Sequence, residues 1–149
     1  MKNFNKFVNF LERKLLPIVE KMEGQVHLQA VKNSMLALLP VTIIGSFTLV
    51  AVNLAQVMPN SFYANFISTY ESEIMNLFNF SMGLMGLFTA LFVSYFLSRS
   101  YDMYTIGDCL NGIVLYLILN SSVTKNGIDT TFLDSKGMFT GIFVAIISV

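Results

Sequence analysis

Four side chains in this sequence carry groups that often do chemistry in proteins: the lone histidine, the lone cysteine and two nearby acids. His27 could carry a phosphoryl group or bind a ligand, and Cys109 could act as a phosphorylated thiolate. Asp102 and Asp108 lie near the start of an apolar stretch, and an acid near the entrance of a membrane span can be functional. Cys109 has no basic cluster or glycine-rich loop around it. We therefore expect His27 to be an interfacial polar residue, Cys109 to pack, and the two acids to be solvated.

No sequence motif gathers these side chains into a catalytic site. The chain has no glycine-rich phosphate loop, no metal-spaced cluster of His, Cys and acids, and no nucleophile elbow. Asn111 and Asn120 are polar residues inside an apolar stretch, where they could face a polar path or form hydrogen bonds between helices. The second role is the commoner one. The sequence therefore predicts no catalytic residue, no cofactor and no metal ion.

The composition indicates what kind of molecule must position these residues. Of the 149 residues, 54% are hydrophobic and 12% are charged, against the ~25% of charged residues typical of a soluble domain. Nine Lys and Arg balance nine Asp and Glu, so the chain lacks the basic excess of a protein that binds nucleic acid. A disordered chain is polar and highly charged, which this chain is not. These figures predict an integral membrane protein, with the lipid bilayer as a partner and no nucleic acid.

The positions of the charges divide the chain into membrane spans. Charged residues are missing from residues 33–70, 74–98, 109–124 and 137–149. A span needs about 20 mostly apolar residues, because each helical residue covers ~1.5 Å of a hydrocarbon layer that is ~30 Å thick. The sequence therefore predicts an all-α integral membrane fold: an amphipathic amino-terminal helix, three full transmembrane helices and a truncated fourth. The three full spans are Ser34–Val57, Ile74–Ser98 and Thr105–Val123.

The fourth apolar run, residues 137–149, is too short to cross the hydrocarbon layer. It would leave the carboxylate of Val149 inside the membrane, where a charge is costly. We expect the chain to be the amino-terminal piece of a longer membrane protein; a complete small protein with a re-entrant last segment is the alternative. Residues 1–149 then form a single membrane domain, with residues 1–32 as an interfacial amphipathic segment and residues 33–149 as transmembrane helices.

Residues 4–22 have the apolar periodicity of a helix that lies in the membrane interface. Eight apolar residues recur at helical spacing and form one face, while the charged residues fall mostly elsewhere on the helix. The apolar residues are Phe4, Phe7, Val8, Leu11, Leu15, Ile18, Val19 and Met22. A basic amphipathic helix just before a span is typical of an interfacial helix. Packing on a soluble partner is the alternative.

The distribution of Lys and Arg predicts the orientation in the membrane. Six of these residues precede the first span, one follows the second span and two follow the third. An amino terminus on the inside therefore places seven of them inside and two outside. Because loops rich in Lys and Arg stay on the cytoplasmic side, we expect a multi-pass protein with a cytoplasmic amino terminus.

Small residues recur every four positions in two of the predicted spans. Gly86, Ala90 and Ser94 form such a stripe in the second span, and Gly137 and Gly141 begin one in the fourth. Small residues at this spacing let helix backbones approach closely. The stripes are candidate helix-packing sites, either between two copies of the chain in a homodimer or within one bundle.

Several segments, taken in order, resemble a known family. They are FLERKLLP (residues 10–17), QVHLQAVKN (25–33), LPVTIIGSF (39–47) and SYFLS (94–98), and the regions around Gly112 and Gly137–Gly141 fit as well. Together they resemble the start of the membrane component, enzyme IIC, of the lactose/cellobiose class of bacterial phosphotransferase systems. The resemblance covers essentially the whole chain. Lys32-Asn33 stands where the family usually has Arg-Asp.

The resemblance implies a parent function and a location. The parent would be a sugar permease of a bacterial plasma membrane that takes up a β-linked disaccharide or a similar oligosaccharide, coupled to phosphorylation. Its partners would be the soluble IIA and IIB components, and it would form a homodimer through its amino-terminal spans. The family's sugar-binding acid and histidine lie in the carboxy-terminal half, so no substrate residue can be carried over to this sequence, and His27 is not that histidine.

Two functional hypotheses follow from the sequence. In the first, the chain is the scaffold and dimerisation region of a sugar permease and is inactive alone. In the second, it is a complete small membrane protein that acts by helix association, as an assembly or regulatory partner. An in-frame continuation of the coding DNA beyond codon 149 would favour the first hypothesis.

Overall fold

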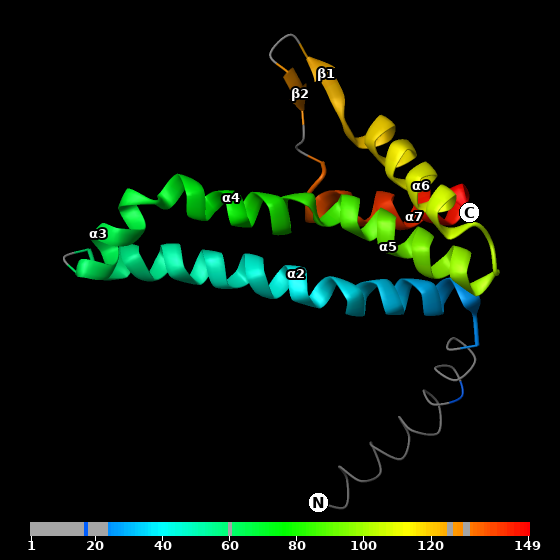
Figure 1. Cartoon of the computed structure of the whole chain (residues 1–149), viewed down its shortest axis with the longest axis horizontal. Coiled ribbons are helices and arrows are strands. Elements are labelled where there is room, and N and C mark those ends of the chain that lie inside the picture. Colours follow the sequence, from blue (N-terminus) through cyan, green and yellow to red (C-terminus); the bar gives the residue numbers. More distant parts are fainter. Residues whose placement is uncertain (1–16, 18–23, 60, 125–126, 130–131) are drawn as a thin grey trace, which may run out of the picture.

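A computed structural model of the chain describes residue 17 and residues 24–59, 61–124, 127–129 and 132–149 (Figure 1). The interfacial helix expected over residues 4–22 therefore lies almost entirely outside the described residues and stays a prediction. The described part is a set of packed helices with one small β-hairpin. Its first helix, α2, covers Val26–Val57 and continues without interruption across residues 32 and 33, where the sequence suggested a boundary, and through Pro40.

A second long helical stretch runs back along α2. It consists of α4 (Glu71–Ser81), the short 3₁₀ segment η1 (Met82–Leu84) and α5 (Met85–Ser100). Figure 1 shows α2 lying alongside α4 and α5 over its whole length. These two stretches, Val26–Val57 and Glu71–Ser100, are long and apolar enough to cross a membrane.

A short helix, α3 (Phe62–Thr69), closes the end of this pair. It begins at Ser61, whose side chain accepts a hydrogen bond from the backbone N–H of Ala64 at 3.1 Å. Behind it lies a small apolar cluster made of buried residues from α2 and α3: Val52, Ala55, Ala64 and Ile67.

The chain turns sharply after α5 and returns as α6 (Thr105–Asn120). In this turn the Ser98 carbonyl accepts hydrogen bonds from the N–H groups of Tyr101 and Met103, at 3.1 and 3.0 Å. Asp102 has a φ of 53° there, a left-handed conformation in which Asp and Asn are enriched among non-glycine residues. The turn sets α6 antiparallel to α5.

After α6 come an antiparallel hairpin, the 3₁₀ segment η2 (Ser135–Gly137) and α7 (Met138–Ser148). The hairpin pairs β1 (Ser122–Thr124) with β2 (Gly127–Asp129), with Val123 opposite Ile128. Helices α6 and α7 pack on α5 and on each other around a second apolar cluster: Ala90, Tyr116, Leu133 and Val144.

The predicted all-α membrane architecture is confirmed, with its long antiparallel spans and short last helix. Several features differ from the prediction. The first long helix begins at Val26 rather than Ser34. The third helix ends at Asn120 rather than Val123, because Asn120 and Ser121 bond back to the carbonyls of Tyr116 and Leu117 and the hairpin begins at once. The second span contains a break at η1, which apolar periodicity does not reveal.

Candidate functional site: the helix break and the crossing loop

The most unusual local structure is the break between α4 and α5. The Ser81 hydroxyl donates to the carbonyls of Leu77 at 2.5 Å and Phe78 at 3.2 Å, and a glycine follows at Gly83. Hydroxyl groups that bond back into a helix, and Ser/Gly pairs, are common causes of helix kinks. The N–H of Gly86 leaves the helical pattern and donates to the carbonyl of Leu133 at 2.9 Å. A loop from a distant part of the chain therefore completes the hydrogen bonding of the break.

That loop, residues 132–137, is held from a third side by α6. The hydroxyl of Tyr116, a fully buried residue, donates to the carbonyl of Phe132 at 2.8 Å. Asp134 caps the start of η2, because its carboxylate accepts a hydrogen bond from the N–H of Lys136 at 2.8 Å. The same carboxylate lies 3.9 Å from the ammonium group of Lys136. The loop thus joins the break in α5, the middle of α6 and the start of α7.

Glycines make the close contacts around this loop possible. A Cβ atom on Gly141 would lie 2.7 Å from the carbonyl oxygen of Gly86 and 3.3 Å from the backbone nitrogen of Ala90. One on Gly137 would meet the carbonyl oxygen of Phe132. The structure therefore brings Gly86, Ala90 and Gly141 together inside one chain, at a contact between α5 and α7.

Ser94, the remaining member of the predicted stripe, faces α6 and the end of α7. A Cβ atom on Gly112 would meet its hydroxyl, and the same hydroxyl lies 3.3 Å from that of Ser148. All the candidate helix-packing residues thus have packing partners within the chain. Contacts between two chains through these residues stay a hypothesis.

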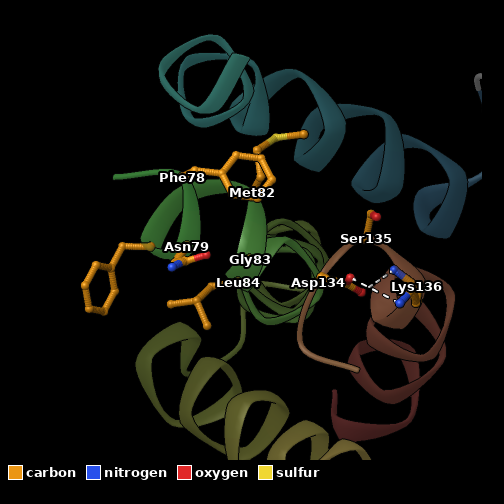
Figure 2. Close-up of a pocket in the computed structure, with 9 residues that line it drawn as sticks. Phe78, Asn79, Met82, Gly83, Leu84, Asp134, Ser135 and Lys136 are labelled. Carbon is orange, nitrogen blue, oxygen red and sulfur yellow. Dashed lines mark hydrogen bonds and ion pairs between the residues drawn. The ribbon is translucent and has the colours of Figure 1, made fainter. Parts of the chain in front are cut away.

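A pocket of about 670 Å³ opens beside the break (Figure 2). Figure 2 shows Phe78 and Met82 on the side of α2, Asn79 and Leu84 beside each other, and the Asp134–Lys136 pair opposite them. Its lining residues are Phe78, Asn79, Phe80, Met82, Gly83, Leu84, Asp134, Ser135 and Lys136. Aromatic rings and hydrogen-bonding groups could contact a small polar molecule, but this lining holds no cysteine and no histidine.

The side chains that could take part in a reaction lie outside this pocket and apart from one another. The His27 Nε2 atom lies 3.3 Å from the Tyr101 hydroxyl, which joins the start of α2 to the turn after α5. The Ser98 hydroxyl donates to the carboxylate of Asp108. Cys109 points at the carbonyl of Leu91, 3.8 Å from its sulfur. Each therefore contacts a neighbouring helix or turn.

The two asparagines of α6 do not share a site. Asn120 donates to the carbonyl of Tyr116 in its own helix at 3.1 Å, while Asn111 is exposed and lines a small groove with Val114 and Ser148. Within the described ranges, no three His, Cys, Asp or Glu side chains are grouped in a way that could hold a metal ion. Sequence reasoning missed the anchoring role of Tyr116, because a lone tyrosine in an apolar helix gives no signal of its distant partner.

No family model matches the chain, but curated proteins do. It is 28% identical to the lichenan permease IIC component of Bacillus subtilis, over 97% of this chain and 35% of that protein. It is 27% identical to the lactose-specific EIICB component of Staphylococcus epidermidis, over 97% of this chain and 26% of that protein. For the cellobiose-specific EIIC component of Geobacillus stearothermophilus the identity is 22%, over 97% of this chain.

The fold also matches a solved structure. The transporter ChbC, the IIC component of an N,N′-diacetylchitobiose-specific phosphotransferase system, superposes with a TM-score of 0.71 and 20% sequence identity. The match covers 93% of this chain and 35% of that protein. The chain spans about a third of the length of the first curated relatives that it matches.

These matches define the class of protein. The predicted resemblance to the IIC permease components of lactose/cellobiose-type phosphotransferase systems is confirmed. The chain is a membrane protein related to part of such a permease, and its helical fold is that of a IIC transporter.

Proposed function

We propose that this chain forms the helical scaffold of an oligosaccharide permease of the phosphoenolpyruvate-dependent phosphotransferase system. The transported sugar is a β-linked disaccharide or a similar oligosaccharide, and uptake is coupled to phosphorylation. The scaffold itself carries neither the sugar site nor a catalytic residue. Alone, the chain is inactive in uptake.

One observation carries this proposal: the chain is about equally similar to relatives named for different sugars. It is 28% identical to the lichenan permease component, 26% to the oligo-beta-mannoside-specific component and 27% to a lactose-specific one, each over 97% of its length. A segment that selected the sugar would be expected to favour one of these proteins. Similar identity to all three supports a role in the framework that they share.

The geometry of the site supports the same role. The loop 132–137, Tyr116 and the paired glycines fix α5, α6 and α7 to each other, which is what a scaffold requires. A sugar site requires a pocket with convergent polar groups, and phosphoryl transfer requires the hydroxyl held in line with its donor. The polar groups that line the pocket beside η1 are Asn79, Ser135 and the Asp134–Lys136 pair, and two of these four side chains are already paired with each other.

The scaffold belongs to a single membrane domain that spans residues 1–149. Its amino terminus is cytoplasmic, and two copies pair through the transmembrane region. The soluble partners are IIA and IIB components. The relatives named EIICB support the IIB partner, because their names join the two components.

The alternative, a small protein that acts by helix association, relied on the stripes of small residues. The structure uses Gly86, Ala90 and Gly141 within one chain. No other feature of the described residues favours that function.

Sugar titration tests the absence of a sugar site. Detergent-purified chain, shown to be helical by circular dichroism, is titrated with cellobiose, lactose and chitobiose. We expect no saturable binding of any of the three sugars. Saturable binding that is lost in Asn111→Ala or Asn79→Ala would place a sugar site in this part of the permease and contradict the proposal.

A further inference from the structure

The two long helical stretches exceed the thickness of a membrane. α2 has 32 residues and the stretch Glu71–Ser100 has 30. At ~1.5 Å per residue they are about 48 and 45 Å long, whereas the hydrocarbon layer is ~30 Å thick. The bilayer therefore covers only part of this antiparallel pair, unless the helices tilt strongly.

The structure divides the pair into two unequal parts at η1. In α2, Gly45 lies opposite Ser81 and Met82. On one side of this level, residues 26–44 of α2 lie with α5, α6 and α7; we call this the four-helix half. On the other side, residues 45–57 of α2 lie beside α4, and the short helix α3 closes their end; we call this part the two-helix arm. Among the described residues, α6 and α7 pack extensively on α5, and neither packs extensively on α4 (Figure 1).

Polar side chains distinguish the two parts. In α5 the residues Thr89, Ser94 and Ser98 are all fully buried, so its outer surface is apolar as far as Arg99. The two-helix arm instead exposes many polar side chains: Asn53, Gln56, Asn65, Ser68, Thr69, Glu71, Ser72, Glu73, Asn76 and Asn79. Exposing amides and carboxylates to hydrocarbon is costly. Exposed apolar residues occur on both parts and do not separate them.

The four-helix half also exposes His27, Gln29 and Lys32, which lie in the first two turns of α2 at the end away from the break. Further from its ends, Asn111 is exposed in the middle of α6. It lies in the groove that also contains Ser148, so its amide has a polar neighbour there. A single asparagine beside another polar group is tolerated in membrane helices far better than the ten polar residues of the arm.

Charged residues mark both ends of the four-helix half. At one end lie Arg99 and Asp108, with the exposed rings of Tyr101 and Tyr104. At the other end lie Asp134 and Lys136, next to the break. From Ser81 to Tyr101 the helix advances about 30 Å, which equals the thickness of the hydrocarbon layer. Tyrosines at one boundary are typical of the membrane interface.

We propose that the hydrocarbon layer encloses only the four-helix half, and that the two-helix arm projects from the membrane on the side opposite the amino terminus. The spans Ser34–Val57 and Ile74–Ser98, taken from the charge pattern, would centre the bilayer near Gly45 and Met82. That position would hold the Asp134–Lys136 pair and the β-hairpin at the middle of the hydrocarbon. This inference adds the position of the bilayer to the proposed function, and it does not depend on sugar uptake.

Depth-dependent quenching tests this position. Single cysteines are placed on a Cys109→Ser background and labelled with bimane, and the protein is reconstituted in phospholipid vesicles. Leu36 and Val114 report on the four-helix half, and Val50 and Leu77 on the arm; all four are more than half exposed. Ser72→Cys, at the start of α4, serves as the aqueous reference. Quenching by nitroxide-labelled lipid is compared with quenching by iodide.

We expect lipid quenching to be severalfold stronger at Leu36 and Val114 than at Val50 and Leu77, and iodide to quench the two arm positions as it quenches position 72. The reverse order of depth, with Val50 and Leu77 quenched most strongly by lipid and protected from iodide, would overturn the proposal. This readout does not involve transport, so a failed uptake experiment and a misplaced bilayer remain distinguishable.

Discussion

At the scale of single residues, the packing of α7 on α5 depends on the lack of a side chain at Gly141. A Cβ atom there would lie 2.7 Å from the carbonyl oxygen of Gly86, which is closer than real Cβ contacts allow. The clash involves backbone on both helices, so neither side chain rotation nor local adjustment can relieve it. The helices must instead move apart.

Gly141→Leu should therefore destabilise the protein by about 1–3 kcal/mol, the usual cost of overpacking a well-packed contact. The measurement is the midpoint of unfolding in increasing SDS, followed by circular dichroism. Gly83→Ala is the matched control, because a Cβ atom at that position has no neighbour closer than 3.9 Å. Equal midpoints for the two variants would argue against the α5–α7 contact.

Tyr116→Phe removes the hydroxyl that holds the crossing loop. The carbonyl of Phe132 then loses its 2.8 Å hydrogen bond in a partly buried setting, which should cost about 1 kcal/mol. The loop should also open more often, so the amide of Gly86 should exchange its hydrogen faster. Unchanged exchange at Gly86 in this variant would show that Tyr116 does not anchor the loop.

At the scale of elements, the sequence predicted the long helices well and the break poorly. Charge-free runs at residues 33–70 and 74–98 mark long apolar segments, and these contain most of α2 and most of the stretch Glu71–Ser100. The break at η1 depends on Ser81 and on the carbonyl of Leu133, which lies about 50 residues further along the chain. Periodicity reports local preference only, so a distant backbone partner leaves no trace in it.

The small-residue stripes show the same limit at the site. Their spacing correctly marks Gly86 and Gly141 as places of close helix approach, because only a missing side chain permits such contact. The spacing does not reveal which helix approaches. The pairing of α5 with α7 follows from the turn at Asp102, the hairpin and the loop, which are tertiary features.

The orientation of the helices is a separate prediction. A reporter fused after residue 65, in α3, should show periplasmic or extracellular activity, and one fused near Asp102 should show cytoplasmic activity. The reason is the excess of Lys and Arg before the first span and at Arg99. The opposite pattern of reporter activities would reverse the topology and with it the side from which the two-helix arm projects.

At the scale of the whole molecule, the chain corresponds to about a third of each IIC relative. Its described helices hold together through backbone contacts and small residues and contain no cluster of reactive side chains. A permease divided in this way would keep its framework in one part and its sugar selectivity in another. We therefore predict that the framework can be exchanged between permeases while sugar selectivity stays with the rest of the permease.

A chimera of two permeases measures most directly which part determines the sugar selectivity. The segment of the Bacillus subtilis lichenan permease IIC component that aligns with this chain is replaced by residues 1–149, and sugar uptake is compared with that of the unchanged permease at matched membrane abundance. We predict uptake with the sugar preference of the host permease. A chimera that inserts at normal abundance but has acquired a different sugar preference would contradict the account, because selectivity would then reside in this chain.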